Sequence, residues 1–370
     1  MSASGARRVA TPAAPTVAAA TSLDSVRVDP AAPAASGRVR SAPGRAAALV
    51  GLGALVVALM AASLFVGSGD LGVRDAWDAL WGSGDGTNDV IVRDYRVPRA
   101  LLAALAGAGL GVAGAVIQAL TRNPLADPGI LGVTGGAYFT VVVGVAFLGI
   151  TGMVPTVLCG LVGAMLTAVT VYVIGSSGRA GAAPAKMVLT GLALGSMLSG
   201  VSYGITLLLP SVFDKIRFWQ IGSLQGRQID AVVGIAPFIA VGLLLALLLA
   251  RPLNALALGD DLARTLGARI VATRALSFVA ITLLCGAATA AVGPIAFVGL
   301  IVPHVARALV GPDERWTIPA CLVLGPLLFV GSDIVGRVAV EGELPVGIVT
   351  AFVGAPVLIH LVRRGKAGEQ

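Results

Sequence analysis

Charged residues, aromatic residues and cysteines are all scarce in this 370-residue sequence. Charged residues make up only 12% of the chain and aromatic residues 5%, whereas hydrophobic residues make up 56%, and the mean hydropathy is +0.92. These proportions exclude an ordinary soluble domain. Cys159, Cys285 and Cys321 are widely separated within apolar runs, so they indicate neither a zinc site nor a disulfide framework. We interpret them as buried structural thiols, and we expect no metal site.

Ionisable side chains are almost absent from the long apolar runs. An ion-coupled carrier usually keeps an acid, a histidine or a polar cluster near the middle of the bilayer, because the coupling ion needs a ligand there. The runs offer no obvious candidate, since Asp333 lies at the end of one run and His360 beside the last basic cluster. The chain also lacks the G-x-x-x-x-G-K-[ST] loop that holds nucleotide phosphates. If the protein is a pump, another chain must supply the energy.

Ten apolar runs remain once the polar segments are set aside, and each is taken as a membrane-spanning helix. At 1.5 Å per residue, about twenty residues cross the roughly 30 Å hydrocarbon core of a bilayer. The expected helices are Ala46–Val66 and about 100–120, 129–148, 154–174, 187–209, 231–250, 271–292, 294–310, 316–332 and 344–362. Pro294 and Pro303 interrupt one run, so a short or broken helix is expected there. The predicted fold class is an all-α polytopic membrane protein.

The N-terminal residues 1–45 are rich in Ala, Pro, Ser and Arg and are predicted to form a disordered arm. Their arginines resemble the charged region of a signal peptide, but the next run lacks a convincing cleavage site, so a retained first helix is favoured. A ten-helix domain at 46–365 and a short tail at 366–370 would follow. With the N-terminus inside, 18 of the 26 Lys and Arg fall on inner segments, which predicts that both termini are cytoplasmic.

The segment from residue 96 to residue 137 carries the most information. Its apolar helix begins behind arginines that the charge rule disfavours on the outer side, and it ends at a polar turn, Asn123 to Gly129. Gly107, Gly111 and Gly114 lie at spacings of four and three, so one helix face can approach a neighbour closely. For the glycines alone, an ordinary packed helix without a special role is the favoured interpretation.

The largest polar insertion on the predicted inner side lies between the sixth and seventh runs. Leucines recur there at every fourth position, an acidic pair precedes an arginine at helix-pair spacing, and a glycine follows the last leucine. The pattern predicts a short amphipathic helix with its caps, comprising Leu258, Gly259, Asp260, Asp261, Leu262, Ala263, Arg264, Thr265, Leu266 and Gly267. Spacing alone leaves two roles open, a docking helix and a helix that merely covers the loop.

A second inner segment, from Ile301 to Trp316, contains His304 and Arg307 on one helix face. One histidine without a nearby cysteine or acidic partner is poor evidence for a metal ligand. We therefore favour a structural role at a helix end.

Several blocks resemble the FecCD family, the permease subunits of ABC importers for iron–siderophore complexes, haem and vitamin B12. The resemblance covers about residues 46–365. The blocks are RVPRALLAALAGAGLGVAGAVIQALTRNPLADPGILGVTGGA, LGDDLARTLGA, GPIAFVGLIVPHVARALVGPDER, SDIVGRVAVEGELPVGIVTAFVGAPVLIHLVRR and, more weakly, WQIGSLQG. The sequence departs from the family pattern in its long arm, at Glu314, where a histidine is frequent, and at His360, where an apolar or aromatic residue is common.

The resemblance implies the architecture of a type II ABC importer permease in the cytoplasmic membrane. Two ten-helix subunits, identical or paired, would enclose a translocation path within the membrane lipid, with a cytoplasmic ATPase under each and an extracytoplasmic binding protein that delivers substrate. This chain would be neither an enzyme nor a nucleic-acid binder. It would bind no cofactor, because ATP and Mg²⁺ belong to the ATPase. An iron–siderophore complex is the favoured substrate, with haem and cobalamin left open.

The resemblance also implies roles for particular residues. The segment Leu258 to Gly267 corresponds to the coupling helix that docks into the ATPase. Arg96, Arg99 and Arg337 match positions that present arginines to acidic residues of the binding protein, through attraction that salt would weaken. The small residues Gly107, Gly111 and Gly114 are expected to permit helix movement along the path.

Two other functional classes are kept as alternatives. An ion-coupled secondary transporter is disfavoured by the charge-free runs. A membrane prenyltransferase would need two acidic clusters for magnesium and diphosphate, and Asp260 with Asp261 is one pair without a second on the inner side.

Overall fold

The computed structural model describes residues 37–39, 41–67, 72–81, 86–177, 184–340 and 342–367. Residues 35–370 form one compact unit. Most of the predicted arm lies outside the described residues, as do residues 368–370 of the predicted tail. Throughout the described ranges the regular secondary structure is helical, in agreement with the all-α prediction.

Ten helices of this unit correspond to the ten predicted spans. Seven are long and apolar enough to cross a bilayer, whereas α5, α12 and the described apolar part of α14 are shorter. The ten are α1 (Ala42–Phe65), α4 (Val97–Thr121), α5 (Val133–Phe147), α6 (Met153–Ser176), α7 (Pro184–Leu208), α9 (Ile229–Ala257), α11 (Ile270–Val292), α12 (Val298–Val310), α13 (Glu314–Val338) and α14 (Val346–Ala367).

Shorter helical pieces occupy the connections. They are α2 (Val73–Trp81), α3 (Thr87–Val90), the π-helical η2 (Ile91–Arg96), the 3₁₀-helical η3 (Pro128–Leu131), α8 (Pro210–Gln220) and α10 (Asp260–Thr265). Of these, only the α10 segment was predicted as a separate short helix. The start of α5 differs from the prediction because the Asp127 carboxylate accepts a 2.8 Å hydrogen bond from the Gly129 amide and starts η3 instead. Gly132, at φ 75°, then turns the chain into α5.

Two of the predicted spans contain prolines, and one is short whereas the other is longer than predicted. The span at Pro294 is short, as expected: α12 begins only at Val298, after Phe297 adopts a left-handed φ of 69°. In contrast, α9 continues through Pro252 to Ala257, seven residues beyond its predicted end. Leu253 and Leu256 are buried in these extra turns, and their packing offsets the backbone hydrogen bond that proline cannot donate.

Helix α4 forms the centre of the core and packs against α13, α11, α9 and α12. Its glycines explain how closely the backbones approach. A methyl group added at Gly107 would meet the Gly325 carbonyl of α13, and one added at Gly114 would overlap the Gly299 carbonyl of α12. Gly111 lies between them against Val302 and Cys321. The glycine face predicted for this helix is therefore a packing face, as small residues allow in membrane helices.

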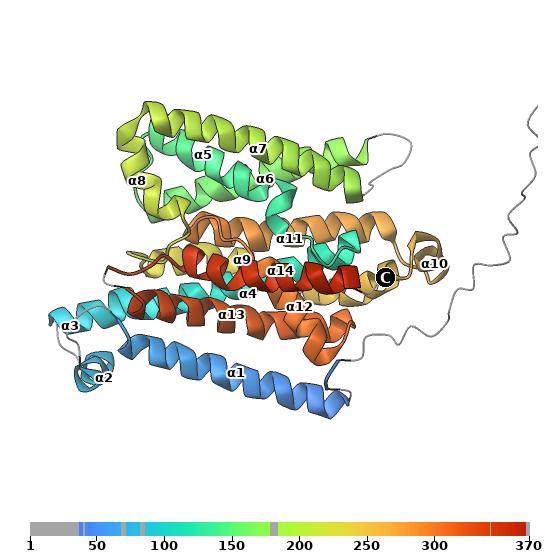
Figure 1. Cartoon of the computed structure of the whole chain (residues 1–370). Coiled ribbons are helices and arrows are strands. Elements are labelled where there is room, and N and C mark those ends of the chain that lie inside the picture. The colour runs from blue at the N-terminus through green and yellow to red at the C-terminus, as the bar shows by residue number, and fades with distance from the viewer. Residues whose placement is uncertain are drawn as a thin grey trace, which may run out of the picture. The chain divides into compact units, whose positions relative to one another are not determined.

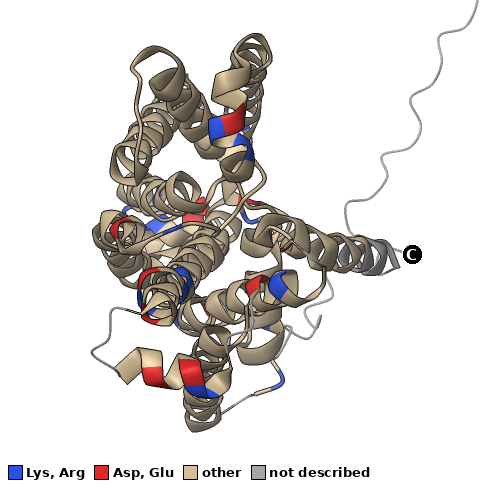
Figure 2. Ribbon diagram, turned by 90° about the vertical axis from the view of Figure 1, so that its left-hand side faces the viewer, with Lys and Arg blue, Asp and Glu red and all other residues tan. Residues whose placement is uncertain are grey.

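The helices run between two ends of the unit (Figure 1). One end, here called the α10 end, carries α10 and the start of α1. The opposite end carries α2, α3 and α8, and is called the arginine end because α4 begins there behind Arg96. Viewed onto the arginine end, the long helices are largely free of charged residues, which gather at helix ends and in short connecting helices (Figure 2).

Candidate functional site

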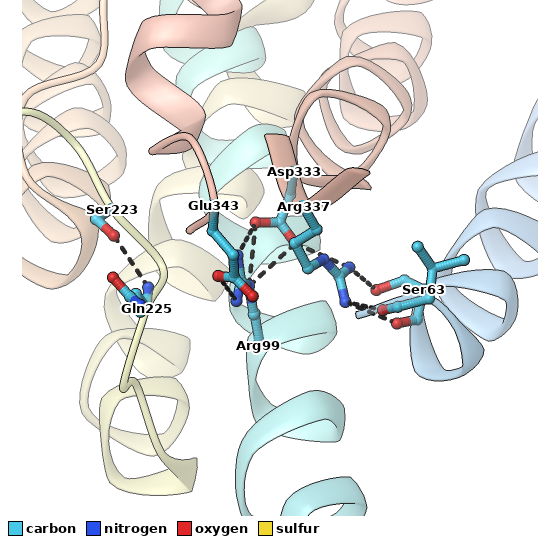
Figure 3. Close-up of polar contacts among 8 residues, drawn as sticks. Ser63, Arg99, Ser223, Gln225, Asp333, Arg337 and Glu343 are labelled. Carbon is cyan, nitrogen blue, oxygen red and sulfur yellow. Dashed lines mark hydrogen bonds and ion pairs between the residues drawn. The ribbon is translucent and has the colours of Figure 1, made fainter. Parts of the chain in front are cut away.

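The arginine cluster consists of Arg96, Arg99, Asp333, Arg337 and Glu343, at the start of α4, the end of α13 and the loop before α14. Arg99 is its centre. The Arg99 guanidinium donates to both oxygens of the Asp333 carboxylate, with a shortest distance of 2.8 Å, and to Glu343 Oε2 at 2.9 Å. Figure 3 shows the Arg99 side chain directed at both carboxylates. Such charge-assisted, multidentate bonds fix the orientation of the arginine.

Arg337 lies deeper, with 2% of its side chain exposed. Its guanidinium is 3.0 Å from Asp333 Oδ2, and Nη1 donates to the backbone carbonyls of Ser63 and Val66 at 2.9 and 2.6 Å. These two carbonyls lie at the end of α1, so Arg337 joins α13 to α1 (Figure 3). Its Nε atom is buried and has no hydrogen-bond acceptor among the described residues.

Arg96 differs from the other two arginines in its partners. It donates a 2.8 Å hydrogen bond to the Leu64 carbonyl, and no described residue forms a salt bridge with it within 4.0 Å. With Arg99 and Arg337 it lines a cavity of about 190 Å³, whose wall also includes Arg227 and Glu343. Burial lowers the pKa of Arg227 to about 10, although nearby Asp230 acts to raise it. Arg227 therefore stays charged at neutral pH, and the cavity wall holds four arginines and one carboxylate, that of Glu343. Asp333 binds Arg99 and Arg337 without lining the cavity.

At the α10 end, the Asp260 carboxylate connects three helices. Its Oδ1 accepts a 2.6 Å bond from Arg122, which follows α4, and its Oδ2 accepts a 2.8 Å bond from Arg274 of α11. Arg122 also donates to the Leu256 carbonyl of α9 at 2.8 Å. Partial burial acts to raise the pKa of Asp260, but the bonds and charges of the two arginines outweigh it and lower the pKa below its usual range. The contact therefore persists at neutral pH.

The rest of α10 faces outward. Leu258, Leu262 and Leu266 are each at least half exposed, and Ala263 is buried beneath them. Arg264 pairs with Asp261 at 2.9 Å on the exposed surface. Gly259 and Gly267 have φ values of 106° and 79°, so the six-residue helix is bounded on both sides by turns that favour glycine. Of the predicted coupling residues, Asp260 and Ala263 make the inward contacts, and the leucines remain available for a partner.

Sequence reasoning missed four residues of these two ends. Arg122 and Arg274 lie 138 and 14 positions from Asp260 and gave no local signal. Asp333 and Glu343, the partners of Arg99, were also missed as site residues. A signal for Asp333 was present, because an acid and an arginine spaced four apart in one apolar helix form a pair on the same face.

Comparison with known proteins then identifies the family. The FecCD transport family matches residues 55–364 of this chain. The chain belongs to the FecCD transport family. It is 46% identical over 325 residues to the ferric enterobactin transport system permease protein FepD of Escherichia coli, with 88% of this chain and 97% of FepD covered.

Two further comparisons support the same conclusion. The siderophore transport system permease protein YfiZ of Bacillus subtilis, whose assignment is given as probable, is 39% identical, with 84% of this chain and 94% of YfiZ covered. A solved chain in an inward-facing conformation, whose assignment as a metal-chelate type ABC transporter is given as putative, has a TM-score of 0.75 and 27% identity, with 86% of this chain and 99% of the solved chain covered.

Membership of the FecCD transport family confirms the predicted functional class and the predicted fold. This FecCD chain is a multi-pass membrane permease subunit of an ABC importer, and ATP hydrolysis belongs to a separate ATPase subunit. ATPase and binding-protein partners follow from the family. The roles predicted for the arginines, the coupling residues and the glycines stay predictions.

Proposed function

We propose that this chain moves a ferric siderophore across the cytoplasmic membrane, as one of two permease subunits around a shared path. In this arrangement the α10 end and both termini are cytoplasmic, and the arginine end faces the binding protein. The observation that carries the substrate assignment is the 46% identity to a ferric enterobactin permease over nearly the whole chain. ATP and Mg²⁺ bind to the partner ATPases, and this chain needs no cofactor of its own.

The substrate assignment predicts selective complementation. In cells that lack their siderophore permease, this chain with its own binding protein and ATPase should restore uptake of radiolabelled ferric siderophores. Uptake of radiolabelled cobalamin, measured in a cobalamin-permease deletion strain, should not recover. Recovery of cobalamin uptake without ferric siderophore uptake would contradict the assignment.

The arginine end has the charge balance that an acidic partner requires. Four arginines and one carboxylate, that of Glu343, line the cavity, and Arg96 forms no salt bridge with any described residue. An acidic side chain of the binding protein would gain charge-assisted hydrogen bonds there, and the surplus positive charge would speed its approach at low salt. Arg99 and Arg337 serve this role indirectly, because their internal bonds to Asp333 hold the cavity wall in place.

The docking role predicts the effect of reversing one charge. We expect Arg96→Glu to weaken binding-protein affinity at least about tenfold at low salt, because it places a carboxylate where an acidic side chain must bind. Affinity for the ATPase subunits should not change. Both affinities can be measured on the purified permease in nanodiscs.

Arg217→Glu on α8 is the charge-reversal control for the docking test. Arg217 lies at the same end and is half exposed, whereas Arg96 is 6% exposed. Its nearest carboxylate is that of Asp214 at 3.9 Å, and its guanidinium lies over the Phe218 ring. Unchanged binding-protein affinity in Arg96→Glu, or an equal loss in Arg217→Glu, would contradict docking at the cavity.

A further inference from the structure

A cavity of about 600 Å³ opens at the α10 end between α9 and the start of α11. Most of its wall is apolar, and the outward-facing Leu248 and Leu276 are 67% and 43% exposed. Apart from two arginines, the wall is formed by residues of α9, of the α10–α11 connection and of α11: Leu245, Leu248, Leu249, Pro252, Ala255, Leu266, Gly267, Ala268, Ala272, Thr273 and Leu276. This composition suits an acyl chain or another apolar segment.

Two arginines stand at the rim of this apolar cavity. Arg251 belongs to α9 and Arg269 directly precedes α11, and both are exposed. Neither guanidinium has a hydrogen bond or ion pair within the described ranges. The acidic side chains of α10 are already engaged, because Asp260 binds Arg122 and Arg274, and Asp261 binds Arg264. The rim therefore carries two positive charges that no described acidic side chain pairs with.

The position of Arg251 and Arg269 relative to the membrane surface follows from the helices that carry them. On α9, exposed apolar side chains extend from Ile229 to Leu248, and Arg251 follows this surface. The last six residues of α9 then lead to the polar α10 segment. Arg251 and Arg269 thus mark the boundary at which apolar helix surface gives way to polar chain, which is where phospholipid headgroups lie.

A second apolar groove lies on the other side of α11. It lies between α6 and α11, has a volume of about 190 Å³ and is lined by Met165, Tyr172, Phe278 and Val279 among others. Leu276 lines the first cavity and Val279 the second, one helical turn apart, and both are exposed. The exposed face of α11 therefore offers apolar surface for acyl chains on either side of the helix.

We propose that the cavity between α9 and α11 holds one phospholipid with an anionic headgroup. Arg251 and Arg269 bind the headgroup, and its acyl chains lie on Leu245, Leu248 and Leu276. Basic pockets between membrane helices recognise anionic lipids through this combination of charge and apolar surface. The bound lipid connects the two helices that α10 joins, so the lipid composition of that leaflet acts on the position of α10. This inference does not depend on the transported substrate.

The test places a reporter in the wall of the cavity of the full chain. The variant Leu248→Trp, at an exposed position, is reconstituted in phosphatidylcholine vesicles that contain either brominated phosphatidylglycerol or brominated phosphatidylcholine. Quenching of the parent chain, with its four native tryptophans, is subtracted. We expect brominated phosphatidylglycerol to associate several-fold more strongly than brominated phosphatidylcholine.

The arginine variants identify the headgroup contacts. Adding Arg251→Gln or Arg269→Gln should reduce the preference for phosphatidylglycerol by about fivefold each. Arg315→Gln, at an exposed arginine of the same end that pairs with Asp313, should leave the preference intact. Equal quenching by the two lipids, equal losses in all three variants, or release of the lipid by millimolar inorganic phosphate would each overturn the proposal.

Discussion

Replacing Asp260 with alanine should lower substrate transport per ATP hydrolysed at least tenfold while the ATPase subunits remain active. A helix of six residues cannot hold its own position, because isolated short helices are unstable. In this protein the Asp260 carboxylate ties α10 to Arg122 after α4 and to Arg274 of α11. Without it, movement of the ATPase would displace α10 without moving the helices beside the path. Substrate uptake and phosphate release, measured together in proteoliposomes, give the ratio of substrate transported to ATP hydrolysed.

The partners of Asp260 supply the control for this prediction. Asp260→Ala and Arg274→Gln remove the same contact, so their effects on the coupling ratio should be clearly less than additive in the double variant. Asp214→Ala, an exposed acid of α8 at the opposite end, should leave the ratio unchanged. Full coupling in Asp260→Ala, or strictly additive effects with Arg274→Gln, would show that α10 is held in another way.

Replacing Asp333 with alanine should destabilise the permease by about 3–5 kcal/mol, the cost of removing one partner from a buried ion pair. Only 2% of the Asp333 side chain is exposed, and both Arg99 and Arg337 bind it. The substitution would leave Arg337 buried without a carboxylate, with its bonds to Ser63 and the α1 carbonyls as its remaining partners. The midpoint of thermal unfolding in detergent measures the loss.

Asp214→Ala is the matched control for stability. Asp214 also precedes an arginine on a helix, but the pair is exposed and its closest atoms are 3.9 Å apart, so its loss should cost about 1 kcal/mol or less. Similar unfolding midpoints for Asp333→Ala and Asp214→Ala would contradict the structural role of the buried cluster.

The long helices were predictable because each follows from a property of its own segment. The charge-free run behind Arg99 predicts α4, and its glycines predict a close helix contact, although only the structure identifies Gly325 and Gly299 as the groups they meet. The short α8 was missed because its eleven residues are amphipathic and too few to cross a bilayer. The helices were predicted from the length and hydropathy of apolar runs, and a short amphipathic helix has neither the length nor the hydropathy of such a run.

The polar sites were predictable only in part. The leucine spacing located α10, and the family resemblance singled out Arg96, Arg99 and Arg337. Contacts between distant segments left no local pattern: Arg122 meets Asp260 across 138 positions and Arg99 meets Asp333 across 234. The sequence indicated that arginines stand at the outer side. It did not indicate that Arg99 and Arg337 are held by an internal carboxylate, whereas Arg96 forms no salt bridge with a described residue.

The central claim is that substrate movement through this chain depends on ATP hydrolysed by partner subunits. The most direct test is uptake of a radiolabelled ferric siderophore into proteoliposomes that contain the permease, its ATPase subunits and its binding protein. We predict uptake only when all three components and ATP with Mg²⁺ are present, and none when a proton or sodium gradient is applied to the permease alone. Uptake driven by an ion gradient without the ATPase subunits would contradict the account.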